Sequence, residues 1–591
     1  MTVAEANLLR AQLMIEELRR RGTGHVVICP GSRSSPLAIA VAMDKRIRSV
    51  VHYDERGAGF FAVGYARATG KPAPVITTSG TAAANLLPAI VEASMDNLPL
   101  LAITADRPPE LHGCGANQTI DQSQLYGNHI RAQALLPCPD DPVGAISVLS
   151  AVSDVYARAL RSSSSPGPAH LNCPFREPLV PPAGDIRSLD ETISEHQPEL
   201  TDWYCSVKPY GGEPAPTRPL EPTVLKSTIE IIRQTNRGLL IIGYLRTDHE
   251  RRTALELSRN LNWPTLADIT SGLSGIPEPH MVRHYDLILA SVDFADSHAP
   301  DTVLHIGGRF TSKRLLQFIE RSQPAHYIFN AGHDVIFDPV RAVTLRTGHE
   351  TSVFCRSLGE HTGQSSANTP WLDGWSRAGS EAARTVAQGC SEDQPLTEPS
   401  LARALSERLG TDAALFLASS LPIRDMDMFA SLRGTVSVAA NRGASGIDGT
   451  IASACGYAAG LGQPVVLLIG DQSCLHDLNS LALVRQSRQP LVIVVINNNG
   501  GRIFELLPIA EHRELLDRFF VAPHGFTIGR IAEMFGLQYE SVRTLGKFRK
   551  TLDRAGRSQQ STIIEVMVDP AHGLEHRSQL LQAVQAAVET D

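Results

Sequence analysis

Short apolar runs rich in β-branched residues alternate with longer stretches rich in alanine and leucine along the whole 591-residue chain. This alternation is typical of β-α-β units, in which helices connect parallel strands and cover both faces of a sheet. The run from Pro464 to Gly470, for example, reads as a buried strand that turns at once into Asp471. The sequence therefore predicts an α/β fold of doubly wound parallel sheets.

Two polar tracts rich in proline, glycine and serine divide this pattern. One covers residues 176–200 and continues in "KPYGGEPAPTRPLEPT", and the other covers residues 359–375. Such composition is typical of linkers. We therefore predict three domains, at residues 1–190, 215–360 and 395–591.

Composition excludes several classes of protein. The net charge of −8 is mild, and the Lys and Arg residues are scattered, so nucleic acid is not an expected partner. The nine cysteines are widely spaced without a C-x-x-C pair, which favours reduced thiols in a cytoplasm. Residues 1–22 resemble an amphipathic surface helix rather than a signal peptide, and no apolar run approaches the ~18 residues of a membrane span. We expect a cytoplasmic protein that does not bind membranes.

Polar side chains stand directly after many of the predicted strands. In open parallel sheets, ligands bind beyond the carboxyl ends of the strands, so function is expected there. In the first domain these residues are Ser32, Arg33, Glu55, Ser79, Thr81 and Arg107. In the third domain they are Ser420, Arg424, Asn441, Arg442, Asp471 and Asn498.

Asp471 and Asn498 lie 27 positions apart, at the ends of successive predicted strands. A carboxylate, an amide oxygen and the backbone carbonyl of Gly500 are hard oxygen ligands that suit Mg²⁺, which keeps further sites for water and phosphate. The helix that begins at Asp471 adds N–H groups for the same anion. A diphosphate held through a divalent cation is the expected ligand. The alternative is that Asp471 caps the helix and the asparagines form a turn.

The sequence "GDQ" followed by "NN" resembles the metal–diphosphate motif of thiamine-diphosphate enzymes, usually written G-D-G and N-N; here Gln472 replaces the last glycine. Within that superfamily, other stretches resemble the 2-succinyl-5-enolpyruvyl-6-hydroxy-3-cyclohexene-1-carboxylate synthases of menaquinone and phylloquinone biosynthesis. These stretches are "PGSRSSPLA", "DERGAGFFAVGYA", "TSGTAAANLLPAIVEA", "TADRPPEL", "GANQTIDQ", "NRGASGIDG" and "NNNGGRIFELLP". The similarity covers both terminal domains and is weak through the central one.

The resemblance implies roles for particular residues. Thiamine diphosphate supplies a carbanion, and forming it requires a carboxylate against the aminopyrimidine ring. Glu55 matches that carboxylate, and a dry pocket should raise its pKa. Ile447 matches the bulky residue that bends the cofactor. The residues implied for the diphosphate and its Mg²⁺ or Mn²⁺ are Gly470, Asp471, Gln472, Ser473, Asn498 and Gly500. Without the resemblance, Glu55 would be interpreted as a helix-capping surface residue and Ile447 as a core residue.

The implied substrates are 2-oxoglutarate, which is decarboxylated, and isochorismate, which accepts the remaining four-carbon unit by 1,4-addition. Both are polyanions, and arginine forks match carboxylates. Ser420, Arg424 and Arg442 match residues that hold the oxoglutarate-derived group. The set that matches the isochorismate site is Ser32, Arg33, Arg107, Asn117, Gln118, Lys313 and Arg314, and Ile503 and Phe504 would form a wall. For any single arginine the alternative is a solvated ion pair.

The resemblance also implies a homodimer or homotetramer whose active sites lie between subunits, with Glu55 of one facing Asp471 of another. We expect His52 to be structural, and without a G-x-G-x-x-G motif the central domain implies no FAD or nucleotide. Two other functions stay open. One is a different carboligase or decarboxylase, such as an acetolactate-synthase-like enzyme, which the many arginines disfavour. The other is a non-enzymatic cofactor-binding regulator, which the presence of Glu55, Asp471 and Asn498 disfavours.

Overall fold

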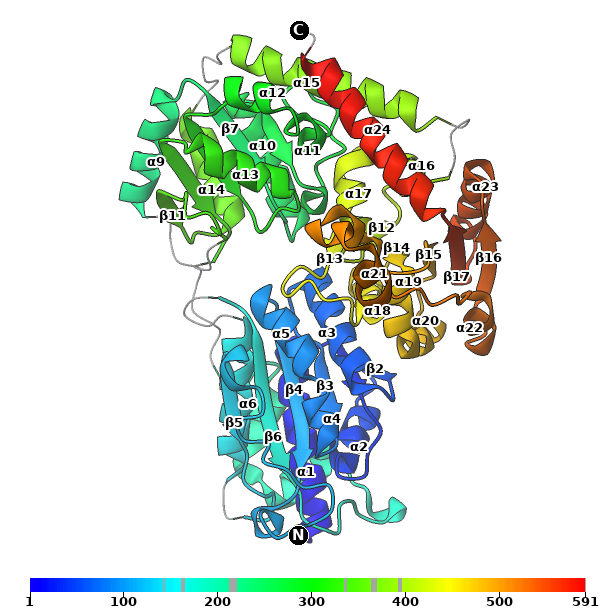
Figure 1. Ribbon diagram of the computed structural model, residues 1–591. Helices are drawn as coiled ribbons and strands as arrows, with labels where there is room; N and C mark the ends of the chain where they lie inside the picture. Colours follow the sequence, from blue (N-terminus) through cyan, green and yellow to red (C-terminus); the bar gives the residue numbers. More distant parts are fainter. Residues whose placement is uncertain are drawn as a thin grey trace. The chain divides into compact units, whose positions relative to one another are not determined.

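The computed structural model describes residues 1–141, 144–160, 165–211, 221–333, 337–362, 369–391 and 396–589 (Figure 1). Within these ranges the strands form three sheets, and every strand pair in them is parallel. The predicted α/β fold of parallel sheets is confirmed. The chain forms two compact units: unit 1 comprises residues 1–215, 441–462 and 477–488, and unit 2 comprises residues 216–440, 463–476 and 489–591.

Unit 1 contains a sheet of six described strands in the order β2-β1-β3-β4-β6-β5. The strands are β1 His25–Ile28, β2 Arg48–Val51, β3 Pro74–Thr77, β4 Leu100–Asp106, β5 Ala132–Leu135 and β6 Pro168–Pro174. The helices are α1 Val3–Arg20, α2 Ser35–Met43, α3 Glu55–Thr69, α4 Thr81–Ala84, α5 Leu87–Met95, α6 Ala145–Leu160, α7 Leu189–His196, α8 Thr201–Cys205, α18 Thr450–Leu461 and α20 Leu481–Gln486. The central strands β4 and β6 are buried at every residue, as expected for strands that helices cover on both faces of the sheet.

Unit 2 contains two sheets. In its described residues the first has the order β11-β10-β9-β7-β8 and the second has the order β13-β12-β14-β15-β17-β16. The strands are β7 Gly238–Ile242, β8 Thr265–Ala267, β9 Thr302–Ile306, β10 His326–Asn330, β11 Leu345–Thr347, β12 Ala414–Leu417, β13 Val438–Ala440, β14 Val465–Gly470, β15 Leu491–Asn497, β16 Gln538–Val542 and β17 Thr562–Met567. The helices are α9 Pro222–Gln234, α10 Asp248–Leu261, α11 Tyr285–Ile288, α12 Val292–Ser297, α13 Lys313–Ser322, α14 Thr351–Thr362, α15 Thr369–Gly389, α16 Glu398–Arg408, α17 Leu421–Phe429, α19 Asp471–His476, α21 Arg513–Leu516, α22 Gly529–Met534, α23 Leu545–Gly556 and α24 Pro570–Glu589.

The polar tract at 359–375 is not a linker, because its described residues belong to α14 and α15. Trp371 and Trp375 of α15 are buried, and α15 lies beside α24 (Figure 1). Residues 363–368 of this tract, residues 212–220 of the other, and the boundaries predicted at 215 and 395 lie outside the described residues. The earlier tract also contains a helix, α7. The domain boundaries stay predictions.

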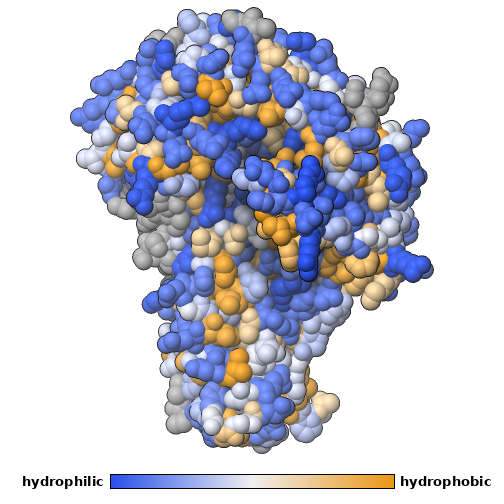
Figure 2. Space-filling model, viewed as in Figure 1, coloured by the Kyte–Doolittle hydropathy of each residue, from blue (hydrophilic) through white to orange (hydrophobic). Residues whose placement is uncertain are grey.

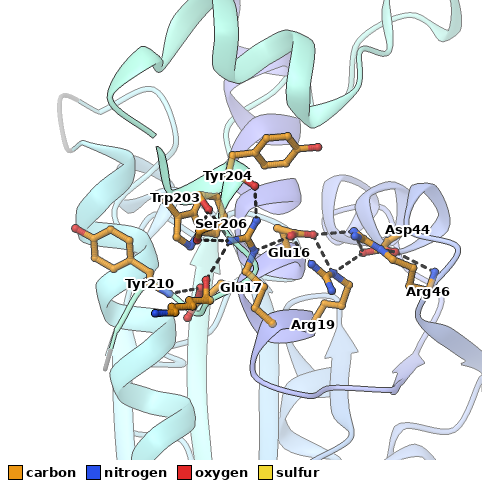
Figure 3. Close-up of polar contacts among 11 residues, drawn as sticks. Glu16, Glu17, Arg19, Asp44, Arg46, Trp203, Tyr204, Ser206 and Tyr210 are labelled. Carbon is orange, nitrogen blue, oxygen red and sulfur yellow. Dashed lines mark hydrogen bonds and ion pairs between the residues drawn. The ribbon is translucent and has the colours of Figure 1, made fainter. Parts of the chain in front are cut away.

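Helix α1 was expected at the surface, and this expectation was wrong. Its charged residues pair with one another in the interior instead of facing water. Glu16 is 5% exposed, and its carboxylate accepts hydrogen bonds from Arg19 at 2.6 Å and Arg20 at 2.7 Å (Figure 3). Glu17 is fully buried and accepts the Tyr210 N–H at 2.8 Å. The charged residues in the sequence therefore did not show whether this helix face is solvated or is buried with its charges in ion pairs.

Helices α3 and α18 approach so closely that their backbones touch. A Cβ on Gly64 would lie 1.9 Å from the Ser453 carbonyl oxygen, and one on Gly456 would lie 1.9 Å from the Phe61 carbonyl oxygen. Only glycine permits this contact. It places α18, which comes from the predicted third domain, in unit 1 with the first sheet.

Among the described residues, no helix is both long enough and apolar enough to cross a membrane. On the face seen in Figure 2, hydrophilic residues predominate and hydrophobic residues appear in small groups.

Asp477 is a fully buried carboxylate that caps α18. Its Oδ2 accepts the N–H groups of Ile451 at 2.7 Å and Ala452 at 3.1 Å, and its Oδ1 accepts the Ser480 hydroxyl at 2.7 Å. Burial raises the pKa of Asp477 from 3.8 to about 6.

This pKa shift predicts a pH-dependent stability. The folded state binds the Asp477 proton more tightly than the unfolded state, so the contribution of Asp477 to stability is greatest below pH 4 and is lost as the pH rises to about 6. Asp477→Asn keeps the side-chain shape but cannot titrate. We expect the free energy of unfolding of the wild type, relative to this variant, to fall on the order of 3 kcal/mol across that window. Urea unfolding at several pH values measures it, and a constant difference would contradict the prediction.

Candidate active site

The carboxyl ends of β14 and β15 bring Asp471 and Asn498 to one edge of the sheet, as the sequence predicted. The strands are neighbours, with Gly470 opposite Ile496. Asp471 is 2% exposed; its Oδ1 accepts the Gln472 N–H at 2.6 Å, and its Oδ2 accepts the Gly500 N–H at 2.9 Å. The second bond ties the two strand ends together.

Asn498 is oriented by a residue that the sequence did not indicate. Its Nδ2 donates to Glu398 Oε1 at 2.8 Å, and both residues are buried. Burial, together with nearby Asp425, raises the pKa of Glu398. Because the amide nitrogen is used by Glu398, the amide oxygen is the atom left for a ligand.

A second segment packs over this edge. The His524 Nε2 lies 3.1 Å from Asp471 Oδ2, and Gln472 Nε2 donates to the Val521 carbonyl at 2.9 Å. Gly500 has a φ of +130°, and a Cβ there would lie 2.2 Å from the Val521 oxygen, so only glycine fits. His524 follows no periodic pattern, so sequence reasoning missed it. Ser473 is buried in α19.

These residues fit a divalent cation that carries a diphosphate. A buried carboxylate, an amide oxygen and a loop carbonyl are the hard donors that Mg²⁺ takes in phosphate sites. Among the residues that the structure describes, no three His, Cys, Asp or Glu side chains gather as a metal site. A cation bound here would therefore depend on the Asp471 carboxylate as its negatively charged protein ligand.

Glu55 is the first residue of α3 and stands at the carboxyl end of β2. It is half-buried within its unit, and Asn85 Nδ2 lies 3.5 Å from its Oε2. The sequence suggested a pocket that excludes water from Glu55. The residues of unit 1 cover Glu55 only in part. His52, just before, is fully buried, and burial lowers its pKa, which favours a neutral ring.

Two predicted arginines meet at the ends of β1 and β4. Arg33 is 6% exposed and donates to the Phe175 carbonyl at 2.9 Å and to Glu177 Oε1 at 2.8 Å. The Arg107 guanidinium donates to the Ser79 hydroxyl at the end of β3. Burial and the charge of Arg33 lower the pKa of Arg107. Two neighbouring arginines, one of which already pairs with Glu177, suit an anionic ligand.

The loop after Arg107 is fastened to the same edge. Gln118 Nε2 donates to the Ser79 carbonyl at 3.0 Å, and the Ser79 hydroxyl donates to the Gln118 carbonyl at 2.9 Å. Gln122, which the sequence did not single out, is buried and accepts the Gly80 N–H at 2.9 Å. Ser32 and Asn117 are exposed.

The remaining predicted residues belong to other segments. In unit 2, Arg424 donates to the Ser420 carbonyl at 2.6 Å, and Ser420 itself has a strained φ of +73°. Arg314 pairs with buried Asp286, and Lys313 is exposed. Ile503 and Phe504 lie in the 3₁₀ helix Arg502–Leu506. Arg442 and Ile447 belong to unit 1, where Ile447 is 39% exposed.

Comparisons with known proteins cover nearly the whole chain. Residues 10–125 match the N-terminal TPP binding domain of thiamine pyrophosphate enzymes, residues 194–417 match the middle domain, and residues 426–566 match the C-terminal TPP binding domain. The chain is similar to proteins named 2-succinyl-5-enolpyruvyl-6-hydroxy-3-cyclohexene-1-carboxylate synthase. That of Rubrobacter xylanophilus is 42% identical over 98% of both chains, and that of Salinibacter ruber is 40% identical over 98% of this chain and 97% of its own. The similarity thus extends through the central domain as well.

Proposed function

The chain belongs to the 2-succinyl-5-enolpyruvyl-6-hydroxy-3-cyclohexene-1-carboxylate synthase family of thiamine pyrophosphate enzymes, and on that premise we propose how its residues carry out the reaction. The enzyme decarboxylates 2-oxoglutarate and adds the remaining four-carbon unit to isochorismate by 1,4-addition, releasing CO₂, in menaquinone biosynthesis. The observation that carries this function is the similarity over 98% of the chain.

Thiamine diphosphate, when bound, supplies the carbanion chemistry of the reaction. We propose that Glu55 holds the aminopyrimidine proton and that Ile447 sets the bend of the cofactor. Asp471, Asn498 and the Gly500 carbonyl would hold Mg²⁺ or Mn²⁺, and Gly470, Gln472 and Ser473 would line the diphosphate. The buried Asp471 carboxylate, tied to Gly500, supports the metal assignment.

Charge supports the assignment of the substrates. Arg424, beside Ser420, and Arg442 would hold the carboxylate of the oxoglutarate-derived group. Isochorismate would lie against Arg33 and Arg107, where burial and then the charge of Arg33 lower the Arg107 pKa. The other residues assigned to it are Ser32, Asn117, Gln118, Lys313 and Arg314, with Ile503 and Phe504 as apolar walls.

We infer that the enzyme is a homo-oligomer in which a partner subunit completes the pocket of Glu55. The half-exposed Glu55 of unit 1 supports this, because an acid–base carboxylate works best when water is excluded. Light scattering distinguishes a dimer from a tetramer. The cytoplasmic location stays a prediction.

Replacing Glu55 tests its role directly. Glu55→Gln keeps the side-chain size but removes the acid–base group, so turnover should fall by ~10² or more. Thiamine-diphosphate affinity, measured by calorimetry, should stay close to that of the wild type. Glu195→Gln, an exposed glutamate of α7 in the same unit, is the control and should leave both unchanged. Wild-type turnover in Glu55→Gln would remove Glu55 from the chemistry.

The two substrate sites should fail at different steps. Losing an arginine that pairs with a substrate carboxylate costs about 2–5 kcal/mol. Arg107→Ala should therefore raise the KM for isochorismate at least about tenfold while the KM for 2-oxoglutarate changes little. Arg424→Ala should slow single-turnover CO₂ release from 2-oxoglutarate even without isochorismate. If both variants show the same defect, this division of the pocket is wrong.

A further inference from the structure

The loop that carries Arg442 and Ile447 is held by a buried glutamate from another helix. We call residues 441–449 the Ile447 loop. Glu92 of α5 is 2% exposed, and its Oε1 accepts the Gly443 N–H at 2.8 Å. Its Oε2 accepts the Ala444 N–H at 2.6 Å. Both carboxylate oxygens therefore hold successive backbone groups of this loop.

An arginine compensates the charge of Glu92. Arg67 of α3 is almost fully buried, with Nη2 3.5 Å from Glu92 Oε1 and Nη1 2.6 Å from Asp96 Oδ2. A buried carboxylate is costly unless it is paired and hydrogen-bonded, and Glu92 is both. Hydrogen bonds from N–H groups to an ionised acceptor are also stronger than neutral ones. The loop is thus fixed by a buried carboxyl group that accepts two backbone hydrogen bonds, rather than by apolar packing alone.

The loop needs such fixing because its backbone is strained. Ser445 has a φ of +59°, which non-glycine residues rarely adopt and which persists only when surrounding contacts hold it. Beyond the loop, Asp477 holds the N–H groups of Ile451 and Ala452. Two buried carboxylates therefore bind backbone N–H groups on either side of Ile447. The Ile447 residue itself is 39% exposed.

We propose that Glu92 is a positioning residue of the active site, which fixes the Ile447 loop so that Ile447 meets thiamine diphosphate and Arg442 meets the substrate. This rests on the roles proposed above for Ile447 and Arg442. In this proposal Glu92 acts through its bonds to the loop and not on the cofactor or the substrate itself.

The test compares two variants of the same buried cluster. In Glu92→Gln the amide nitrogen cannot accept an N–H, so one of the two loop bonds is lost. Asp96→Asn is the matched control, because Asp96 also pairs with Arg67 but holds no residue of the loop. Hydrogen–deuterium exchange of the peptide spanning the loop, in the cofactor-loaded enzyme, should be about tenfold faster in Glu92→Gln and unchanged in Asp96→Asn. The Kd for thiamine diphosphate with Mg²⁺, measured by calorimetry, should rise about tenfold in the first variant only.

Each other outcome has a defined meaning. Equal changes in both variants would mean that Glu92 only stabilises the charged cluster, and the proposal would be wrong. Faster exchange with an unchanged Kd would likewise overturn it. If Glu92→Gln does not fold, Glu92→Asp keeps the charge beside Arg67 but is too short for both loop bonds, and takes its place. Ile447→Ala tests the premise separately: wild-type Kd and turnover there would refute the role of Ile447, while the exchange data would still report whether Glu92 holds the loop.

Discussion

The hydrogen bond from the Gly500 N–H to Asp471 joins the ends of two neighbouring parallel strands, and the geometry of the proposed diphosphate site depends on it. Parallel strands that run through the interior can be apolar along their length, so the first polar residues appear where the strands end. There Asp471 is buried, and the N–H groups of Gln472 and Gly500 hold its carboxylate beside the His524 ring. A cation that depends on one charged protein ligand requires such rigidity.

The burial of parallel strands on both faces also made much of the fold predictable. Long apolar runs such as β4, β14 and β15 give a clear signal in the sequence because both of their faces are buried. The edge strands β5, β8, β11 and β16 give a weaker signal, since they are short or carry polar residues. The polar tract at 359–375, whose described residues end α14 and begin α15, was mistaken for a linker, because composition does not reveal which face of a helix is buried.

The candidate site residues also differ in how far the sequence reveals them. Those that directly follow strands, such as Asp471 and Arg107, could be found from their position in the sequence. Residues that contact the candidate site residues or their loop, such as Glu398, His524 and Glu92, lie far away along the chain and carry no local pattern, so only the folded structure brings them together. The charged residues of α1 were wrongly predicted. They were expected to face solvent, but they pair in the interior.

The central claim is that Asp471 holds the cofactor through a divalent cation. Calorimetric titration of thiamine diphosphate into wild type and Asp471→Asn, with and without Mg²⁺, tests it most directly. The matched control is Asp569→Asn, which alters a carboxylate that follows the neighbouring strand β17 in the same sheet and caps α24. The account predicts Mg²⁺-dependent binding in the wild type and the control, weakened at least about tenfold in Asp471→Asn. Wild-type, Mg²⁺-dependent affinity in Asp471→Asn would contradict it and leave Asp471 as a residue that only ties two strand ends together.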